Sequence, residues 1–306
     1  MMATLVDAIT FSSFLSMMGF GLTLVRRTTG VWNVAQAGLV SIGAYVTLTL
    51  VSFVGGSPYL YLPLAFLIGA GVGAILFLVA INPLRKASSI ILLVATIAFN
   101  LILISIINIY ADYLQNVFGI LSKSFLLTRL DFKIFGRPAI STISVSTLLI
   151  FTIAFYLFLR YTRTGLALRG CIEQPSLAGV VGVSVRSLYL FSWVLAGGSA
   201  GLAGGFLPLF FQCNPNIGFY LIALMFCVSI LGGVGEIYGP FLGGWLVGFV
   251  QIFGTTLLAS TLGPWVILYK GLFPMVILVL TLLFVPQGLS GIDWRAKVRI
   301  LKRKGG

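Results

Sequence analysis

Histidine is absent from this chain of 306 residues, and acidic residues are scarce, with six Asp and Glu in total. A serine hydrolase normally takes its general base from histidine, so the Gly-x-Ser-x-Gly match around Ser199 indicates helix packing rather than catalysis. The three cysteines, at positions 171, 213 and 227, form no Cys-x-x-Cys pair and offer no framework for zinc or disulfides. We expect no catalytic residues, no metal site and no cofactor bound by this chain.

Charged residues are also few, at 8%, whereas hydrophobic residues make up 59% and the mean hydropathy is +1.12. A water-soluble domain carries about 25% charged residues and cannot hide so much apolar surface in one core. Lipid must therefore surround the molecule, and we predict an all-α fold, a polytopic transmembrane helical bundle. The net charge of +13 comes from Lys and Arg at the ends of apolar segments, which indicates membrane orientation rather than nucleic-acid binding.

Apolar stretches long enough to cross a bilayer recur along the chain. They lie at 8–25, 34–54, 60–82, 89–110, 140–160, 187–211, 218–235, 238–258 and 264–286. The glycine-rich stretch 218–258 can hold two crossings or one crossing with a re-entrant segment, so we expect eight or nine crossings. The basic loops and tail put 14 Lys and Arg on one side and 4 on the other. This asymmetry predicts an outside N-terminus, a cytoplasmic C-terminus and hence nine crossings.

The longest segment predicted outside the membrane is the loop 111–139, which mixes aromatic and aliphatic residues with charges. It is either an ordinary surface loop or a segment that lies partly in the membrane interface.

Glycine is abundant, with 36 residues, and several pairs are spaced four apart, as in Gly69/Gly73 and Gly197/Gly201. Small residues at this spacing let transmembrane helices pack closely. The cluster Gly232, Gly233, Gly235 and Gly239 has a second interpretation, a helix break that lines a transport pathway.

The source of energy for transport is constrained by the six acidic residues, at positions 7, 112, 131, 173, 236 and 293. All fall outside the middles of the predicted spans, which disfavours a proton relay but leaves sodium binding by carbonyl and hydroxyl oxygens open. The chain lacks the Gly-x-x-x-x-Gly-Lys-[Ser/Thr] loop that binds ATP phosphates. Active transport would need a separate ATPase, and the loop 161–186 is the obvious place for it to dock.

That loop carries a resemblance to a known family. Residues 160–169, Arg-Tyr-Thr-Arg-Thr-Gly-Leu-Ala-Leu-Arg, run into residues 173–183, Glu-Gln-Pro-Ser-Leu-Ala-Gly-Val-Val-Gly-Val. This segment resembles the coupling loop of the permeases of branched-chain amino acid ABC importers. Further similar segments lie at 29–36, 43–45, 197–205, 232–240 and 286–289. In order, spacing and length the chain is closer to the H-type subunit of the permease pair (LivH) than to the M-type subunit.

The resemblance implies that ATP is hydrolysed on two partner ATPase subunits, beside a second permease subunit of the M type and an extracytoplasmic substrate-binding protein. It also implies an ATPase-coupling role for Glu173, Pro175, Ala178 and Gly182. The residues themselves predict a short helix from 173 to 181, with Glu173 favourable at its N-terminus, Pro175 in its first turn and Gly182 at its stop. We expect a permease domain over 1–290 and a basic cytoplasmic tail over 291–306.

Four polar residues lie in or beside the early spans: Asn33, Gln36, Thr96 and Asn100. Thr96 and Asn100 are four apart and share one helix face. Buried amides and hydroxyls are costly in lipid unless they line a cavity or find partners. These residues therefore either line the solute pathway or form hydrogen bonds between helices.

The function we expect is the permease subunit of an ATP-driven importer of branched-chain amino acids or related small polar solutes, in the cell membrane. The alternative is an ATPase-independent channel or sodium-coupled transporter for small solutes, including urea or amides.

Overall fold

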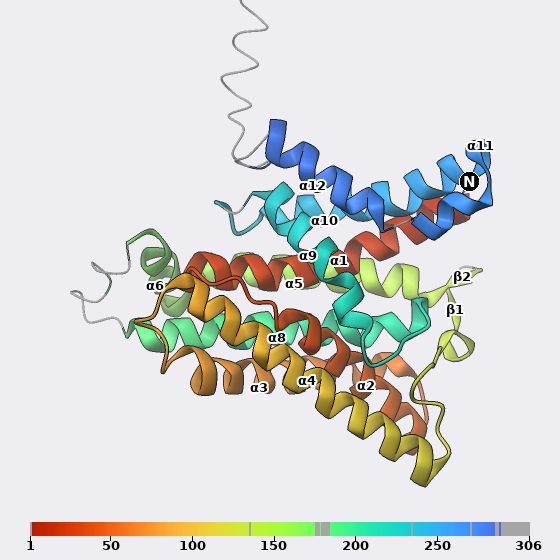
Figure 1. Ribbon diagram of the computed structural model, residues 1–306, viewed down its shortest axis with the longest axis horizontal. Coiled ribbons are helices and arrows are strands. Elements are labelled where there is room, and N and C mark those ends of the chain that lie inside the picture. The colour runs from red at the N-terminus through yellow and green to blue at the C-terminus, as the bar shows by residue number, and fades with distance from the viewer. Residues whose placement is uncertain are drawn as a thin grey trace, which may run out of the picture.

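The computed structural model describes residues 2–134, 136–174, 178, 184–233, 235–269, 271–284 and 288. These residues form a bundle of helices with one small β-hairpin, so the predicted all-α polytopic fold class is confirmed (Figure 1). The elements are α1 (Met2–Thr29), α2 (Gln36–Val54), η1 (Pro58–Tyr61), α3 (Leu62–Leu76), η2 (Phe77–Ile81), α4 (Ser89–Phe118), η3 (Thr128–Leu130), β1 (Lys133–Ile134), β2 (Arg137–Pro138), α5 (Ala139–Tyr161), α6 (Arg163–Glu173), α8 (Val185–Phe210), α9 (Ile217–Gly232), α10 (Gly239–Phe249), η4 (Val250–Gly254), α11 (Thr255–Leu262), η5 (Pro264–Tyr269) and α12 (Leu272–Phe284).

The helices follow the predicted apolar stretches. In the described part of the chain, seven helical segments are long and apolar enough to cross a membrane: α1, α2, η1–α3–η2, α4, α5, α8 and α10–η4–α11. Two predicted spans correspond to shorter helices, α9 with 16 residues and α12 with 13. The glycine-broken stretch 218–258 is divided between α9, which ends at Gly232, and the segment α10–η4–α11, which begins at Gly239.

The first helix is the centre of the bundle. Figure 1 shows α1 running between α10 and α8, and nearly all of its residues from Ala8 to Val25 are buried. Small polar residues of α1 allow this close packing, because their hydroxyls bond to backbone instead of reaching water. The Ser16 hydroxyl lies 2.8 Å from the carbonyl of Ser12 and 3.2 Å from that of Phe241, and the Ser12 hydroxyl lies 2.7 Å from the carbonyl of Ala8 and 3.1 Å from that of Trp245. Each hydroxyl therefore has acceptors both in α1 and in α10.

Glycines hold α3 against α8. A Cβ added to Gly73 would lie 2.5 Å from the carbonyl oxygen of Trp193, and one added to Gly69 would collide with the backbone of Gly197. Gly201 likewise meets α3 without room for a side chain. The two backbones touch directly, which is how helices associate where lipid supplies no hydrophobic drive between them.

The fourth helix is longer than the predicted span 89–110. It begins after Ser88, whose side chain accepts from the amide of Ile91, and ends at Gly119, which adopts φ +66°. That left-handed conformation is unfavourable for residues with a Cβ, so the glycine fixes the stop. The hydropathy falls near residue 110 because polar residues begin there, but the helix continues to Phe118.

The predicted loop 111–139 is correspondingly shorter and is packed onto the bundle. Phe125 forms a β-bridge with Cys213, is 5% exposed, and contacts the ring of Tyr45 edge-on at 5.2 Å. The chain then passes η3 and the hairpin of β1 and β2 before α5 begins.

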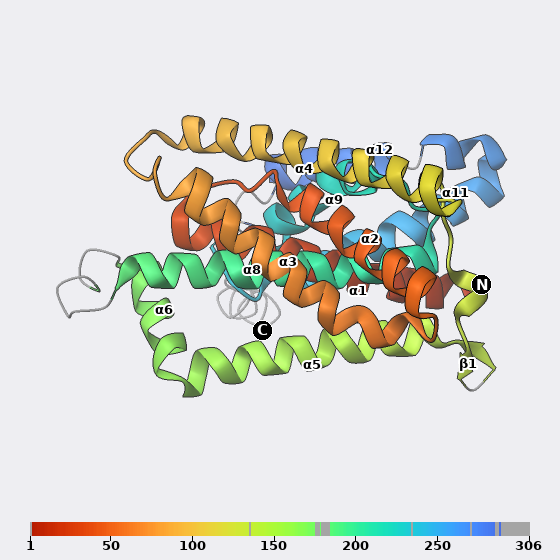
Figure 2. The ribbon, with the colours of Figure 1, turned by 90° about the horizontal axis from the view of Figure 1, so that it is seen from below.

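The molecule has two distinct ends. Figure 2 shows the N-terminus and β1 at one end and α6 at the other, with α4 and α5 on opposite flanks. These two flanking helices are the most exposed of the seven long segments, and their uncovered faces are aliphatic. The exposed apolar surface is what a membrane requires.

Candidate functional site

The second helix begins inside the bundle rather than at its edge. Its first residue, Gln36, is fully buried and donates from Nε2 to the carbonyl of Ala196 at 3.1 Å and to that of Met18 at 3.4 Å. Met18 and Ala196 lie near the middles of α1 and α8. Asn33 donates to Oε1 of Gln36 at 3.1 Å. Residues 30–35 thus carry irregular backbone into the centre of the molecule.

Two side chains of α4 satisfy this irregular backbone. The Thr96 hydroxyl accepts from the amide of Val34 at 3.2 Å, and its proton is shared between the carbonyls of Leu93 at 2.8 Å and Trp32 at 3.1 Å. Asn100 Oδ1 accepts from the amide of Gly38 at 2.8 Å. The first amides of a helix lack partners within it, and Ala35 at the N-cap provides no side-chain acceptor. The fourth helix therefore caps the start of the second.

The four residues predicted for the solute pathway are brought together here, and we call them the polar junction: Asn33, Gln36, Thr96 and Asn100. All four are buried, and most of their hydrogen bonds go to backbone groups. This geometry matches the alternative that the sequence left open, hydrogen bonding between helices. Asn33 Oδ1 is buried without a hydrogen-bond partner. Contact between the junction and a solute stays a prediction.

A residue that the sequence analysis did not select extends the junction to α9. The Ser41 hydroxyl accepts from the amide of Gly218 at 3.1 Å, and the backbone of Ala37 leaves no room for a Cβ on Gly218. The short helix α9 thus begins beside the first turns of α2. Helices that start within the bundle are typical of transporters, where they line cavities. No sequence signal marked Ser41, because serine is common in membrane helices.

The glycine cluster forms the turn between α9 and α10. Gly232 ends α9, Gly233 follows with φ +101°, and Gly239 begins α10. Gly232 and Gly239 are in backbone contact, so a Cβ on either would collide with the other. Gly235 has open space around it. Three of these glycines serve close packing or an unusual backbone angle, and the fourth does neither.

The predicted coupling segment, 161–186, contains a helix that the sequence did not predict. The helix α6 begins after Thr162, whose hydroxyl accepts from the amide of Gly165 at 3.0 Å, and it ends at Glu173. Glu173 is the last residue of α6, so its carboxylate lies at a helix C-terminus. Most of the helix predicted over 173–181 lies outside the described residues and stays a prediction. Ala178 is half-buried and donates its amide to the carbonyl of Gln174 at 3.2 Å. Pro175 and Gly182 lie outside the described residues.

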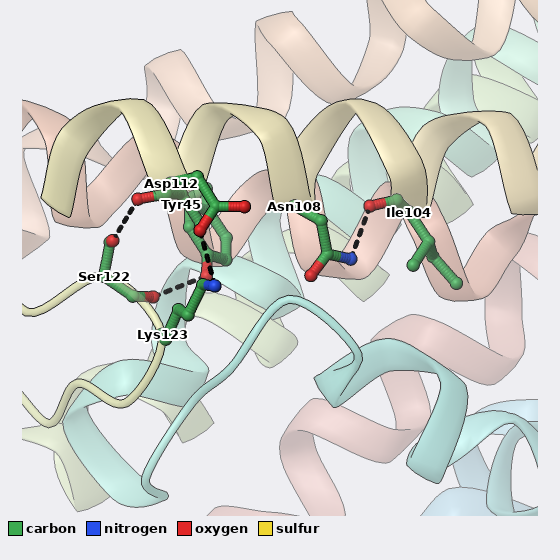
Figure 3. Close-up of polar contacts among 7 residues, drawn as sticks. Tyr45, Ile104, Asn108, Asp112, Ser122 and Lys123 are labelled. Atoms are coloured by element: carbon green, nitrogen blue, oxygen red, sulfur yellow. Dashed lines mark hydrogen bonds and ion pairs between the residues drawn. The ribbon is translucent and has the colours of Figure 1, made fainter. Parts of the chain in front are cut away.

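At the end of the bundle opposite α6, the contacts in Figure 3 hold the loop after α4 against α2 and α4. The Tyr45 hydroxyl donates to the carbonyl of Ser122 at 2.6 Å, and the Ser122 hydroxyl donates to the carbonyl of Ala111 at 2.5 Å. Lys123 forms an ion pair with Asp112 at 2.5 Å, with both side chains about half exposed. An ion pair in such surroundings contributes at most about 1 kcal/mol, so the buried tyrosine contact is the stronger anchor.

The described carboxylates lie outside the core. The five described acidic residues, Asp7, Asp112, Asp131, Glu173 and Glu236, are exposed or half-buried. In the described ranges no three His, Cys, Asp or Glu side chains are arranged to hold a metal ion. The arrangement offers amides, hydroxyls and backbone groups inside the bundle, and charges only at its ends.

Comparison with known proteins agrees with this architecture. The sequence model of the family described as branched-chain amino acid transport system / permease component matches residues 4–282. The Methanocaldococcus jannaschii protein named "Probable branched-chain amino acid transport permease protein LivH" is 40% identical over 96% of this chain and 94% of its own length.

More distant relatives cover the chain equally well. BraD of Pseudomonas aeruginosa, named a high-affinity branched-chain amino acid transport system permease protein, is 27% identical over 94% of both chains. The similarly named LivH of Escherichia coli K12 is 26% identical over 93% of this chain and 94% of its own. No solved structure matches. The chain, with its apolar bundle and matching family model, belongs to the permease components of branched-chain amino acid transport systems.

Proposed function

We propose that this permease carries branched-chain amino acids or related small polar solutes into the cell, driven by ATP that separate subunits hydrolyse. The observation that carries the proposal is the family match over residues 4–282, which spans nearly the whole bundle rather than one motif. The names of the relatives supply the substrate class, since each is called a branched-chain amino acid transport permease.

The distribution of charge supports ATP as the energy source. Proton relays use carboxylates or histidines within the membrane. The chain has no histidine, and its described carboxylates are exposed or half-buried. The free energy for uphill transport would then come from partner subunits, because the chain has no phosphate-binding loop for ATP.

The partners we propose are a second permease subunit of the M type, two ATPase subunits and an extracytoplasmic binding protein. Basic residues at the α6 end support a cytoplasmic assignment for that end. They are Arg26, Arg27, Arg85, Lys86, Arg160, Arg163, Arg169 and Arg186. The ATPases would dock there, on α6 and the segment after Glu173. The N-terminus and the loop after α4 would face outside.

The polar junction is our proposal for the part of the solute pathway that this chain contributes. It lies at mid-depth, where α2 and α9 both begin, and transporters bind solutes at such breaks. Asn33 Oδ1 is a buried acceptor without a partner and suits the ammonium group of an amino acid.

The test is transport by the intact complex, purified through a tag on this chain and reconstituted in proteoliposomes with its binding protein. We expect uptake of labelled leucine that requires ATP and ceases with a non-hydrolysable analogue, while urea is not taken up. Uptake driven by a sodium gradient without ATP would establish the alternative function. Uptake of urea but not leucine would retain the importer class and overturn the substrate.

A further inference from the structure

A polar cavity of about 530 Å³ lies at the α6 end of the bundle. Its walls come from the ends of α1, α5 and α6 and from the turn between α9 and α10, which meet at this end (Figure 2). Five of its lining residues are charged, namely Arg27, Arg160, Arg169, Glu173 and Glu236, and Tyr156 also lines it. The volume is in the range of small-molecule sites.

The three arginines of this cavity are not neutralised. No ion pair joins them to Glu173, Glu236 or any other described carboxylate. Arg27 Nε is buried and has no hydrogen-bond partner. Because three guanidinium groups line one cavity without an ion-paired carboxylate among the described residues, the cavity favours an anion with several oxygens.

One of the arginines is already held in position. The Arg160 guanidinium donates to the Tyr156 hydroxyl and lies over the rings of Tyr156 and Tyr161, at 5.8 and 5.7 Å from their centroids. An arginine fixed in this way loses little conformational entropy on binding. Bidentate contact with phosphate is its preferred geometry.

The surroundings point to a lipid as the source of that phosphate. The fifth helix exposes Ile150, Ile153 and Leu157 just before the cavity, and Tyr161 at its end is 70% exposed. Aliphatic residues followed by tyrosine and arginine mark the passage from hydrocarbon to headgroup. Basic pockets between membrane helices bind anionic headgroups where they lie at the cytoplasmic side.

We propose that this cavity binds the phosphate headgroup of an anionic phospholipid through Arg27, Arg160 and Arg169. The bound headgroup bridges α1, α5 and α6. It therefore fixes α6, the first helix of the predicted coupling segment, against the bundle. Glu173 and Glu236 repel the phosphate and keep its affinity moderate. The site is independent of the solute that the permease carries.

The experiment is lipid retention by the full-length permease, measured by native mass spectrometry after titration with phosphatidylglycerol or phosphatidylcholine. Arg160→Gln and Arg169→Gln should each weaken phosphatidylglycerol binding by roughly fivefold and leave phosphatidylcholine unaffected. Arg163→Gln is the matched control, because it removes an exposed charge from α6 outside the cavity. Glu236→Gln should strengthen binding, a gain that misfolding cannot produce.

Three outcomes would overturn the proposal. The first is that Arg160→Gln retains as much phosphatidylglycerol as the wild type, or that Arg163→Gln loses as much of it as Arg160→Gln does. The second is binding of inorganic phosphate without lipid at the same arginines, which would make the ligand a free anion. The third is that Arg160→Gln and Arg169→Gln retain lipid as the wild type does but no longer associate with the ATPase in the intact complex, which would make the cavity a protein-docking site.

Discussion

Replacing Gly73 by alanine tests whether backbone contact between α3 and α8 determines stability. The added Cβ would lie 2.5 Å from the Trp193 carbonyl oxygen and 3.1 Å from the Cα of Gly197. The first distance is about 1 Å shorter than ordinary van der Waals contact, so the helices must separate. Overpacking of this kind costs roughly 1–3 kcal/mol. A gain of about 0.5–1 kcal/mol from replacing glycine within a helix offsets part of it.

Gly71 provides the matched control, since it lies on the same helix and an added Cβ would meet nothing within 4 Å. The gain in helix propensity is common to Gly71→Ala and Gly73→Ala. Their difference in unfolding free energy therefore isolates the clash, at about 1–3 kcal/mol. We expect Gly73→Ala to melt below Gly71→Ala by roughly 2–4 °C for each kcal/mol, measured by size-exclusion chromatography after heating in detergent. Melting of Gly73→Ala at or above Gly71→Ala would refute the packing argument.

Three further predictions concern the function. The double variant Thr96→Val, Asn100→Leu leaves the amides of Val34 and Gly38 without acceptors, at about 1–3 kcal/mol for the buried amide of Gly38, and should lose leucine uptake; normal uptake by an assembled complex would exclude the polar junction from the pathway. In intact cells, a membrane-impermeant maleimide should label Leu121→Cys but not Thr164→Cys, and the three native cysteines should give little background because they are buried; the reverse pattern would invert the proposed orientation. Gly182→Asp should insert normally yet lose ATP hydrolysis stimulated by solute, and wild-type stimulation would argue against coupling through this segment.

The crossing segments could be predicted from the sequence because their physical cause is local. Spanning a bilayer requires a long apolar run, and such runs are visible without knowledge of the neighbours. The ends were harder, because hydropathy reports composition whereas helix termini depend on caps. Gly119 ends α4 eight residues beyond the predicted span, and Thr162 starts α6 where a loop was expected. Both signals were present in the sequence as a glycine and a threonine.

The polar junction was only partly predictable, because most of its hydrogen bonds have a backbone group as one partner. Thr96 and Asn100 were expected to share a helix face, and both are buried toward α2. Their partners are amide and carbonyl groups of residues 32–38, which every sequence contains. The contact from Gln36 to Ala196 joins positions 160 apart. Nothing in the side chain of Ala196 marks it as an acceptor.

The short helix α9 runs from the polar junction to the cavity that the three arginines line. It begins at Ile217, where the next amide bonds to Ser41 of α2, and it ends at the glycine turn that borders the arginine cavity. At 1.5 Å per residue, its 16 residues extend about 24 Å. Backbone contacts at both ends, at Gly218 and Gly232, leave it little freedom to slide without moving α2 or α10. A displacement at the α6 end would therefore reach the polar junction through one rigid helix, which would link the proposed headgroup site mechanically to the proposed solute pathway.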